Sequence, residues 1–213
     1  MNVELTSSLR TAYHKYTFTK NDDQSVVIDL GFAINWDKAL KTSITIEDDH
    51  TISGYRFSTG WAKNQKVFFV ATFSKPISKY TLADNQKNID GQSVEGEKAK
   101  AQLFFNPEGG IELRVKVAIS SVSVDNAKEN LDSGDFNFEQ AKTEAENTWN
   151  TALSKITVET PVDSLKTIFY TALYHAQLAP VTFSDKNGQF RKENDSIVTA
   201  TNYTAYSTLS LWD

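Results

Sequence analysis

The sequence predicts a mixed fold, an antiparallel β-sandwich followed by helices. Three observations favour it. Residues 1–120 consist of short alternating segments separated by turn residues. The run Val67-Phe68-Phe69-Val70-Ala71 is apolar on both faces, which is typical of an inner strand. Near Val122 the apolar spacing changes from the period of a strand to that of a helix. Roughly eight short strands in the first part indicate a sandwich.

The strands follow one another at short intervals. Residues 12–19 alternate in polarity, and the next four segments are β-branched and apolar: residues 25–30, 42–46, 51–58 and 66–73. Residues 84–98 are polar and contain two glycines, so they predict a long exposed loop. Residues 101–105 and 110–120 predict a hairpin around Asn106-Pro107-Glu108-Gly109-Gly110. Polar residues alternate with apolar ones in its second arm, which predicts one solvated face.

The helical part begins with a short helix predicted over residues 125–131. A longer helix follows, and Asn137 and Gln140 have the spacing of a helix-capping pair at its start. Thr160-Pro161-Val162-Asp163 predicts the start of a third helix, because a hydroxyl cap, an early proline and an acid suit a helix N-terminus. Its buried stripe is predicted to be Leu165, Ile168, Phe169, Ala172, Leu173 and Ala176. The chain is predicted to be irregular from Val181 onward.

Composition excludes several classes of function. The 213 residues carry a net charge of −5, and acidic and basic residues are interspersed without a basic stripe. This argues against nucleic-acid partners and against a polybasic membrane surface. The absence of cysteine excludes disulfides and thiolate metal sites. No segment reaches the roughly 18 apolar residues of a membrane span, and the residues after Met1 lack the cationic and apolar regions that would predict a signal peptide.

Few residues point to catalysis by themselves. His14, His50 and His175 have no second histidine at helical ligand spacing, so they indicate packed or capping side chains rather than metal ligands. Asp185-Lys186-Asn187-Gly188 is similar to a calcium loop, but its glycine comes too early, and a plain turn is favoured. Trp212-Asp213 has the composition of a sugar-holding pair, a ring that stacks and an acid that accepts from hydroxyls. Core packing is expected for Trp36 and Trp61.

An ordered set of motifs adds a resemblance that covers almost the whole chain. In order along the sequence, the motifs are His14-Lys15-Tyr16-Thr17-Phe18, Gly54-Tyr55-Arg56-Phe57-Ser58-Thr59-Gly60-Trp61-Ala62, Val67-Phe68-Phe69-Val70, Phe73-Ser74-Lys75-Pro76, Val117-Ala118-Ile119-Ser120, Ala127-Lys128-Glu129-Asn130-Leu131, Phe169-Tyr170-Thr171-Ala172-Leu173-Tyr174-His175, Phe183-Ser184-Asp185 and Ser210-Leu211-Trp212-Asp213. Together they resemble family 92 of the glycoside hydrolases.

The resemblance implies a β-sandwich packed on an (α/α)6 barrel. It divides the chain into an incomplete sandwich domain (1–121), a helical linker (122–160) and the beginning of a truncated catalytic domain (161–213). It also implies an export location, the periplasm or cell surface of a bacterium.

The implied activity is that of a calcium-dependent, inverting exo-α-mannosidase that releases terminal mannose from glycans. The general acid, the general base and the Ca²⁺ ligands are expected beyond Asp213, and a further segment that reaches the site is expected before Met1. Within the chain only Asp213 carries over as a contact to sugar hydroxyls, with Trp212 as its neighbour. His14, His175 and Asp185 receive no role. The chain is expected to be inactive alone and to pack against the rest of its own protein. The alternative is a non-catalytic β-sandwich that binds carbohydrate or packs on a partner.

Overall fold

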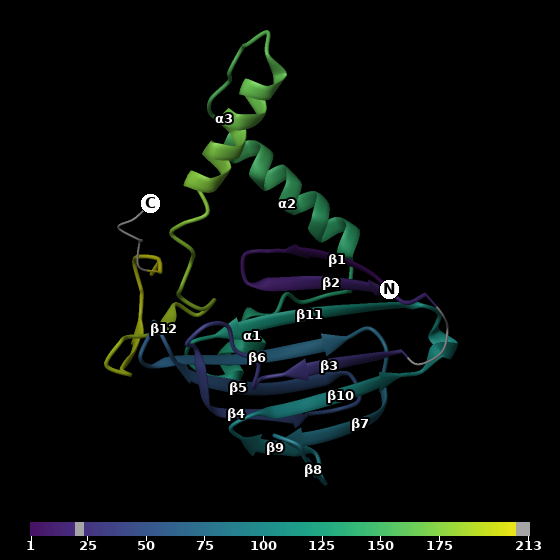
Figure 1. The fold of residues 1–213 in the computed structure, drawn as a ribbon. Coiled ribbons are helices and arrows are strands. Elements are labelled where there is room, and N and C mark those ends of the chain that lie inside the picture. Colours follow the sequence, from purple (N-terminus) through teal and green to yellow (C-terminus); the bar gives the residue numbers. More distant parts are fainter. Residues whose placement is uncertain (20–23, 208–213) are drawn as a thin grey trace.

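The structure is a computed structural model that describes residues 1–19 and 24–207, and its strands form two facing sheets (Figure 1). The larger sheet has the order β1-β2-β11-β6-β5-β4-β9, and the smaller has the order β3-β10-β7-β8. All pairings of these strands in the described residues are antiparallel. The sandwich is therefore confirmed. Its strands are β1 (Asn2–Ser7), β2 (Thr11–Thr17), β3 (Ser25–Asp29), β4 (Lys38–Ile46), β5 (Thr51–Thr59), β6 (Gln65–Phe73), β7 (Ile77–Asp84), β8 (Lys87–Ile89), β9 (Ser93–Gly96), β10 (Ala99–Phe105) and β11 (Glu112–Ser120).

The main core lies between the two sheets. Strand β10 shows how it is built, because its alternate residues Ala99, Ala101, Leu103 and Phe105 are all buried. The ring of Phe105 packs on that of Phe73 from the opposite sheet, with centroids 5.2 Å apart. The largest fully buried apolar side chains are Phe73, Ile44, Ile52, Leu82, Leu103, Leu113, Val70 and Val94.

Gly54 lies in the middle of β5, between β4 and β6. A β-carbon at this position would lie 1.9 Å from the carbonyl oxygen of Ser43 and 2.9 Å from the Phe69 ring. The neighbouring backbone therefore approaches too closely for any side chain, and only glycine fits.

Two predictions for the strands are wrong. Strands β10 and β11 do not form a hairpin, because a 3-10 turn (Pro107–Gly109) carries the chain across from the smaller sheet to the larger one. Asn106 caps this turn, and Gly110 leaves it with a φ of 85°. Residues 84–98 are not only a loop, since they contain β8 and β9. Both strands are very short and polar, and therefore show no alternation that a sequence pattern could detect.

The outer face of β11 is covered, although the alternation of its residues predicted a solvated face. Helix α1 (Val124–Asn130) packs on this face, and Ala127 is buried against Val70 and Ala118. Lys116 is also buried there, and its ammonium group donates 2.9 Å hydrogen bonds to the carbonyls of Asp132 and Gly134. The aliphatic stem of a lysine can line a buried surface in this way while its charge is satisfied by carbonyls.

Helix α2 (Phe138–Leu153) begins as predicted, because Asn137 Oδ1 accepts a 3.1 Å hydrogen bond from the backbone N–H of Gln140. Its first turn is attached to β2. Phe138 is buried against Tyr13. Figure 1 shows that α2 then leaves the sandwich and carries α3 (Asp163–Ala176) at its far end.

The apolar stripe predicted for α3 is not buried in this chain. No residue of the helix is buried, and Leu165 and Ile168 are 55% and 63% exposed. In the described residues its main packing partner is α2, where the rings of Trp149 and Tyr174 lie 4.6 Å apart. The apolar face of α3 is therefore present without a second layer of helices to cover it. None of the described helices is long and apolar enough to span a membrane.

Candidate functional site

The predicted sugar contacts, Trp212 and Asp213, lie outside the described residues. The structure does describe the segment that precedes them, residues 181–207, which we call the return segment because it brings the chain back from α3 to the sandwich (Figure 1). It contains a small antiparallel hairpin, β12 (Gln189–Arg191) and β13 (Ile197–Thr199), where the sequence predicted irregular structure. Three-residue strands are too short for a periodic signal.

The turn predicted at Asp185-Lys186-Asn187-Gly188 is confirmed. The N–H of Gly188 donates to the carbonyl of Asp185 at 2.9 Å, and the N–H of Asp185 donates to the carbonyl of Gln189 at 2.8 Å. Gly188 has a φ of +82°, which favours glycine, and a β-carbon there would lie 2.6 Å from the Ala200 carbonyl.

The side chain of Asp185 is the most enclosed polar group of the return segment, with only 4% of the residue exposed. Its Oδ2 accepts from the Ser120 hydroxyl at 2.6 Å and from Asn126 Nδ2 at 2.8 Å. Its Oδ1 accepts from Asn130 Nδ2 at 2.7 Å. All three donors are themselves buried. We call Ser120, Asn126, Asn130 and Asp185 the junction cluster, since it joins the end of β11, α1 and the return segment.

Helix α1 supplies two of these donors because Asn126 and Asn130 are one helical turn apart and share a face. Buried asparagines in a helix are unfavourable unless their amides are satisfied. Here both amides are satisfied by the return segment, since Asn130 Oδ1 also accepts from the N–H of Lys186 at 2.7 Å.

Asp185 has no partner of opposite charge among the salt bridges of the described residues. A buried carboxylate is costly unless hydrogen bonds replace its lost hydration. Hydrogen bonds to a charged group contribute about 1.5–3 kcal/mol each. The three neutral donors therefore hold the carboxylate in place, and losing any of them would leave it partly unsatisfied.

A second attachment holds the hairpin. Arg191 donates from Nε to the carbonyl of Ser121 at 2.7 Å and from a terminal nitrogen to that of Val122 at 2.9 Å. Asp195, at the tip of the hairpin, pairs with Lys66 of β6 at 2.8 Å. The hydrogen bond from Lys66 lowers the pKa of this carboxyl. Both attachments lie on the tip side of the hairpin, where Arg191 and Asp195 also pair with each other at 3.6 Å, so the tip is bound to the sandwich.

The described residues do not form a metal site. They contain no group of three His, Asp or Glu side chains that could hold an ion. Side-chain oxygens of Asp185, Asn187 and Gln189 do converge, but on Asn126 Nδ2, at 2.8, 3.4 and 3.0 Å. The amide nitrogen of Asn126 thus lies at the point where these three oxygens converge.

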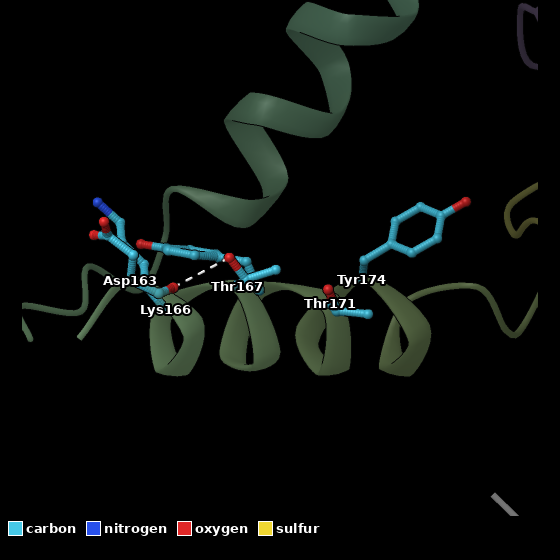
Figure 2. Close-up of a pocket in the computed structure, with 6 residues that line it drawn as sticks. Asp163, Lys166, Thr167, Thr171 and Tyr174 are labelled. Atoms are coloured by element: carbon cyan, nitrogen blue, oxygen red, sulfur yellow. Dashed lines mark hydrogen bonds between the residues drawn. The ribbon is translucent and has the colours of Figure 1, made fainter.

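The structure has two surface hollows, and neither is lined by a pair of acids. The first runs along one side of α3, and Figure 2 shows that its lining residues come from that helix alone; they are Asp163, Lys166, Thr167, Tyr170, Thr171 and Tyr174. The Thr167 hydroxyl donates to the Asp163 carbonyl at 3.1 Å. The second hollow lies between β1 and α2, and its lining contains one acid, Glu146. Glycoside hydrolysis uses two carboxyl groups across the scissile bond, and neither hollow has them.

Core packing was predicted for Trp36 and Trp61, and this prediction is wrong. They are 67% and 87% exposed, and their ring centroids lie 6.4 Å apart. The Arg56–Asp37 ion pair fixes the loop of Trp36 to β5, and Gly60, next to Trp61, lies close to Asp37. The loops extend beyond the ends of the strands, so no opposing sheet covers the rings.

The prediction of packed or capping histidines agrees with His14 and His50 but is wrong for His175. His50 Nδ1 lies 2.8 Å from the Phe73 carbonyl in a turn, and His175 is exposed on α3. His14 is half-buried in β2, where its Nδ1 lies 2.8 Å from the Tyr16 hydroxyl. Burial lowers the pKa of His14 below its ordinary value of 6.5.

The pKa of His14 predicts a loss of stability in acid. The folded chain binds the proton less readily than the unfolded chain, so the stabilisation is present above pH 6.5 and is lost as pH falls below it. We expect His14→Gln to reduce the difference in unfolding free energy between pH 7 and pH 5, measured with urea. His175→Gln serves as the exposed control and should leave that difference as in the wild type. An NMR titration in which His14 ionises at or above pH 6.5 would refute the prediction.

Comparisons with known proteins agree with one another. Residues 1–120 match the profile of the glycosyl hydrolase family 92 N-terminal domain, and residues 125–213 match that of the family 92 catalytic domain. No curated protein matches the chain. A family GH92 α-mannosidase from Bacteroides thetaiotaomicron, also solved with mannoimidazole, has 32% identity and a TM-score of 0.91 over 99% of this chain.

A second structure from the same organism, a family GH92 inverting mannosidase, has 24% identity and a TM-score of 0.80 over 95% of this chain. At 24% identity this similarity shows the shared fold alone. The chain spans only 29% and 28% of the lengths of these two proteins. The larger part of each of these proteins therefore has no counterpart in the 213 residues.

Proposed function

Because the chain belongs to glycoside hydrolase family 92, we propose that it is part of a calcium-dependent, inverting exo-α-mannosidase that releases terminal mannose from glycans. The observation that carries the proposal is the match to an α-mannosidase at 32% identity over 99% of the chain. That protein has been solved with mannoimidazole, and the return segment lies within the matched region.

The chain divides into a sandwich domain over residues 1–121, a helical linker over 122–160 and the beginning of the catalytic barrel over 161–213. The exposed apolar face of α3 supports the last boundary, because a barrel helix needs neighbours on that face. The remainder of the same protein is the expected partner of this face.

In an inverting reaction one carboxylic acid protonates the leaving oxygen and a second carboxylate activates water. We assign neither role to the described residues, since neither hollow contains two acids. Both groups, together with the Ca²⁺ ligands, would come from protein beyond these 213 residues. Asp213 would accept hydrogen bonds from sugar hydroxyls while Trp212 contacts the apolar face of the ring. A periplasmic or surface location in a bacterium follows from the same family resemblance, since the matched α-mannosidase is bacterial.

A second candidate is a non-catalytic carbohydrate-binding module. The exposed Trp36 and Trp61 favour it, because tryptophan rings on rigid loops can stack on sugar faces. Binding of mannosides to the 213-residue chain, abolished by Trp61→Ala, would support this candidate over the enzyme.

Mannose release by the complete protein tests the enzyme proposal. We expect hydrolysis of an aryl α-mannoside by the complete protein, loss of at least 90% of the rate after chelation, and recovery on addition of Ca²⁺ but not of Mg²⁺, which prefers fewer ligands in a stricter geometry. A rate that chelation leaves unchanged would contradict calcium dependence, and the absence of any hydrolysis would contradict the proposed activity.

A further inference from the structure

Strand β1 forms one end of the larger sheet, and in the described residues it pairs with β2 on one side only. The N–H of Ser8 donates to the carbonyl of Thr11 at 2.9 Å. This bond sets the phase of the β1–β2 ladder, because hydrogen-bonded and non-hydrogen-bonded pairs alternate along antiparallel strands. Val3, Leu5 and Ser7 therefore direct their backbone N–H and C=O groups away from β2. These groups form a free strand edge in the part of the chain that the structure describes.

The side chains of Val3 and Leu5 lie at the end of the apolar face that lines the main core. Leu5 is opposite His14, and His14 is opposite Val115, which is buried in that core. Residues that are directly opposite share a face of the sheet. Val3 and Leu5 are nevertheless 44% and 65% exposed, so the core face reaches β1 without being covered there. Strand β1 also has no lysine or proline of the kind that protects exposed edges from pairing.

Helix α2 extends beyond the edge of β1. Its apolar stripe includes Ala141, Ala145 and Trp149, which are spaced by four residues. Ala141 is buried with Tyr13 of β2, whereas Ala145 and Trp149 are only partly buried and line the hollow between β1 and α2. Figure 1 shows α2 continuing past β1 on the side where the sheet would add its next strand. One helical turn rises about 5.4 Å and neighbouring strands lie about 4.8 Å apart, so the stripe is long enough to cover at least one more strand.

An extended chain is the ligand that fits these features together. An added strand binds through main-chain hydrogen bonds to a free edge, and its side chains enter pockets beside that edge. Here the edge offers N–H and C=O groups at every second residue, Leu5 offers an apolar contact on one face, and the hollow beneath α2 lies on the other. The 213 residues span only 29% of the length of the matched α-mannosidase, so the complete protein has further chain that can supply the strand.

We propose that the free edge of β1 and the hollow between β1 and α2 bind an extended β-strand that the same protein supplies from outside these 213 residues. The strand bonds to the backbone of Val3, Leu5 and Ser7. Its side chains pack beside Leu5 on the core face and against Ala145 and Trp149 of α2 on the opposite face. It therefore fastens α2 to the sandwich, whatever reaction the protein catalyses.

The test compares amide hydrogen exchange, residue by residue, in the 213-residue chain and in the complete protein. In the 213-residue chain we expect the protection factors of Val3, Leu5 and Ser7 to be at least tenfold lower than those of Glu4 and Thr6, whose N–H groups face β2. In the complete protein this difference should shrink to threefold or less, because the added strand protects the outward amides.

Leu5→Lys tests the packing of the added strand. The side chain is mostly exposed in the 213-residue chain, whereas in the complete protein the substitution places a charge against the bound strand. We expect the protection factors of Val3 and Ser7 to fall at least tenfold in the complete protein and to stay within twofold in the 213-residue chain. Leu9→Lys is the matched control, since Leu9 is 70% exposed and follows β1; it should change neither protein more than twofold. Unchanged exchange in β5 and β6 shows that each variant keeps the sandwich.

Three results would overturn the proposal. The first is a tenfold difference between the two sets of amides that persists in the complete protein, because the edge would then be unpaired. The second is protection of Val3, Leu5 and Ser7 that rises with the concentration of the 213-residue chain, because a second copy would then occupy the edge. The third is protection in the complete protein that Leu5→Lys leaves unchanged, because no strand would then pack beside Leu5. None of these results depends on mannosidase activity.

Discussion

Gly54→Ala is expected to destabilise the sandwich by about 3 kcal/mol or more, at or above the upper end of the usual range for overpacking. The added β-carbon would lie 1.9 Å from the Ser43 carbonyl oxygen, so β4 or β5 must shift. These strands belong to the middle of the larger sheet, and Ile44 and Ile52 beside them are fully buried. Urea unfolding followed by far-ultraviolet circular dichroism measures the change.

Gly134→Ala provides the matched control. Gly134 has a φ of +91°, and nothing lies within 4 Å of the place that its β-carbon would take. We expect a cost of roughly 1–2 kcal/mol from the left-handed backbone alone. Equal destabilisation by the two substitutions would contradict the steric explanation for Gly54.

Asp213→Ala is expected to lower kcat/KM of the complete protein for an aryl α-mannoside by about 10–100-fold. This corresponds to the loss of about 1.5–3 kcal/mol, the usual contribution of a hydrogen bond to a charged group. Steady-state kinetics with the same substrate measure the change. The fold itself should persist, so circular dichroism of the variant should match that of the wild type.

Asp90→Ala controls for the removal of an acid, since Asp90 is exposed and distant in sequence from the proposed site. Its kcat/KM should stay within twofold of the wild type. A loss in Asp213→Ala no larger than this would remove Asp213 from the substrate site.

Much of the fold could be predicted because periodicity reports burial. The alternation of the early strands reflects faces that the structure buries. The helical spacing after Val122 marks the three helices, of which α1 and the first turn of α2 are buried on the sandwich. Pairing was harder to predict. Strands β10 and β11 are consecutive and separated by a turn, but the turn crosses between the sheets. A sequence pattern describes one strand at a time and does not specify its neighbour.

The sequence pattern also could not predict which faces of strands and helices are covered by later segments of the chain. Lys116 alternates as an exposed residue would, yet residues 132–134 cover it with carbonyls. The opposite case is α3, whose apolar stripe is exposed because α2 is the main element that packs on it in the described residues. Periodicity identifies a face that can be buried, whereas burial depends on what lies opposite.

The candidate site was predicted only in part. The turn at Asp185 was identified, but its burial was not, because turn acids are usually solvated. The sequence did contain one signal: Asn126 and Asn130 occupy one face of a short helix, next to Ala127, which packs on the sheet. Polar residues on a helix face next to an apolar one can indicate a buried acceptor. The sequence alone could not say which acid supplies it.

The anomer-resolved release of mannose, followed by proton NMR, tests the central claim most directly. The complete protein and the 213-residue chain are incubated separately with an aryl α-mannoside. We predict that the complete protein releases β-mannose first, as an inverting enzyme must, and that the 213-residue chain releases none. Release of α-mannose first, release by the 213-residue chain alone, or no release by the complete protein would contradict the account.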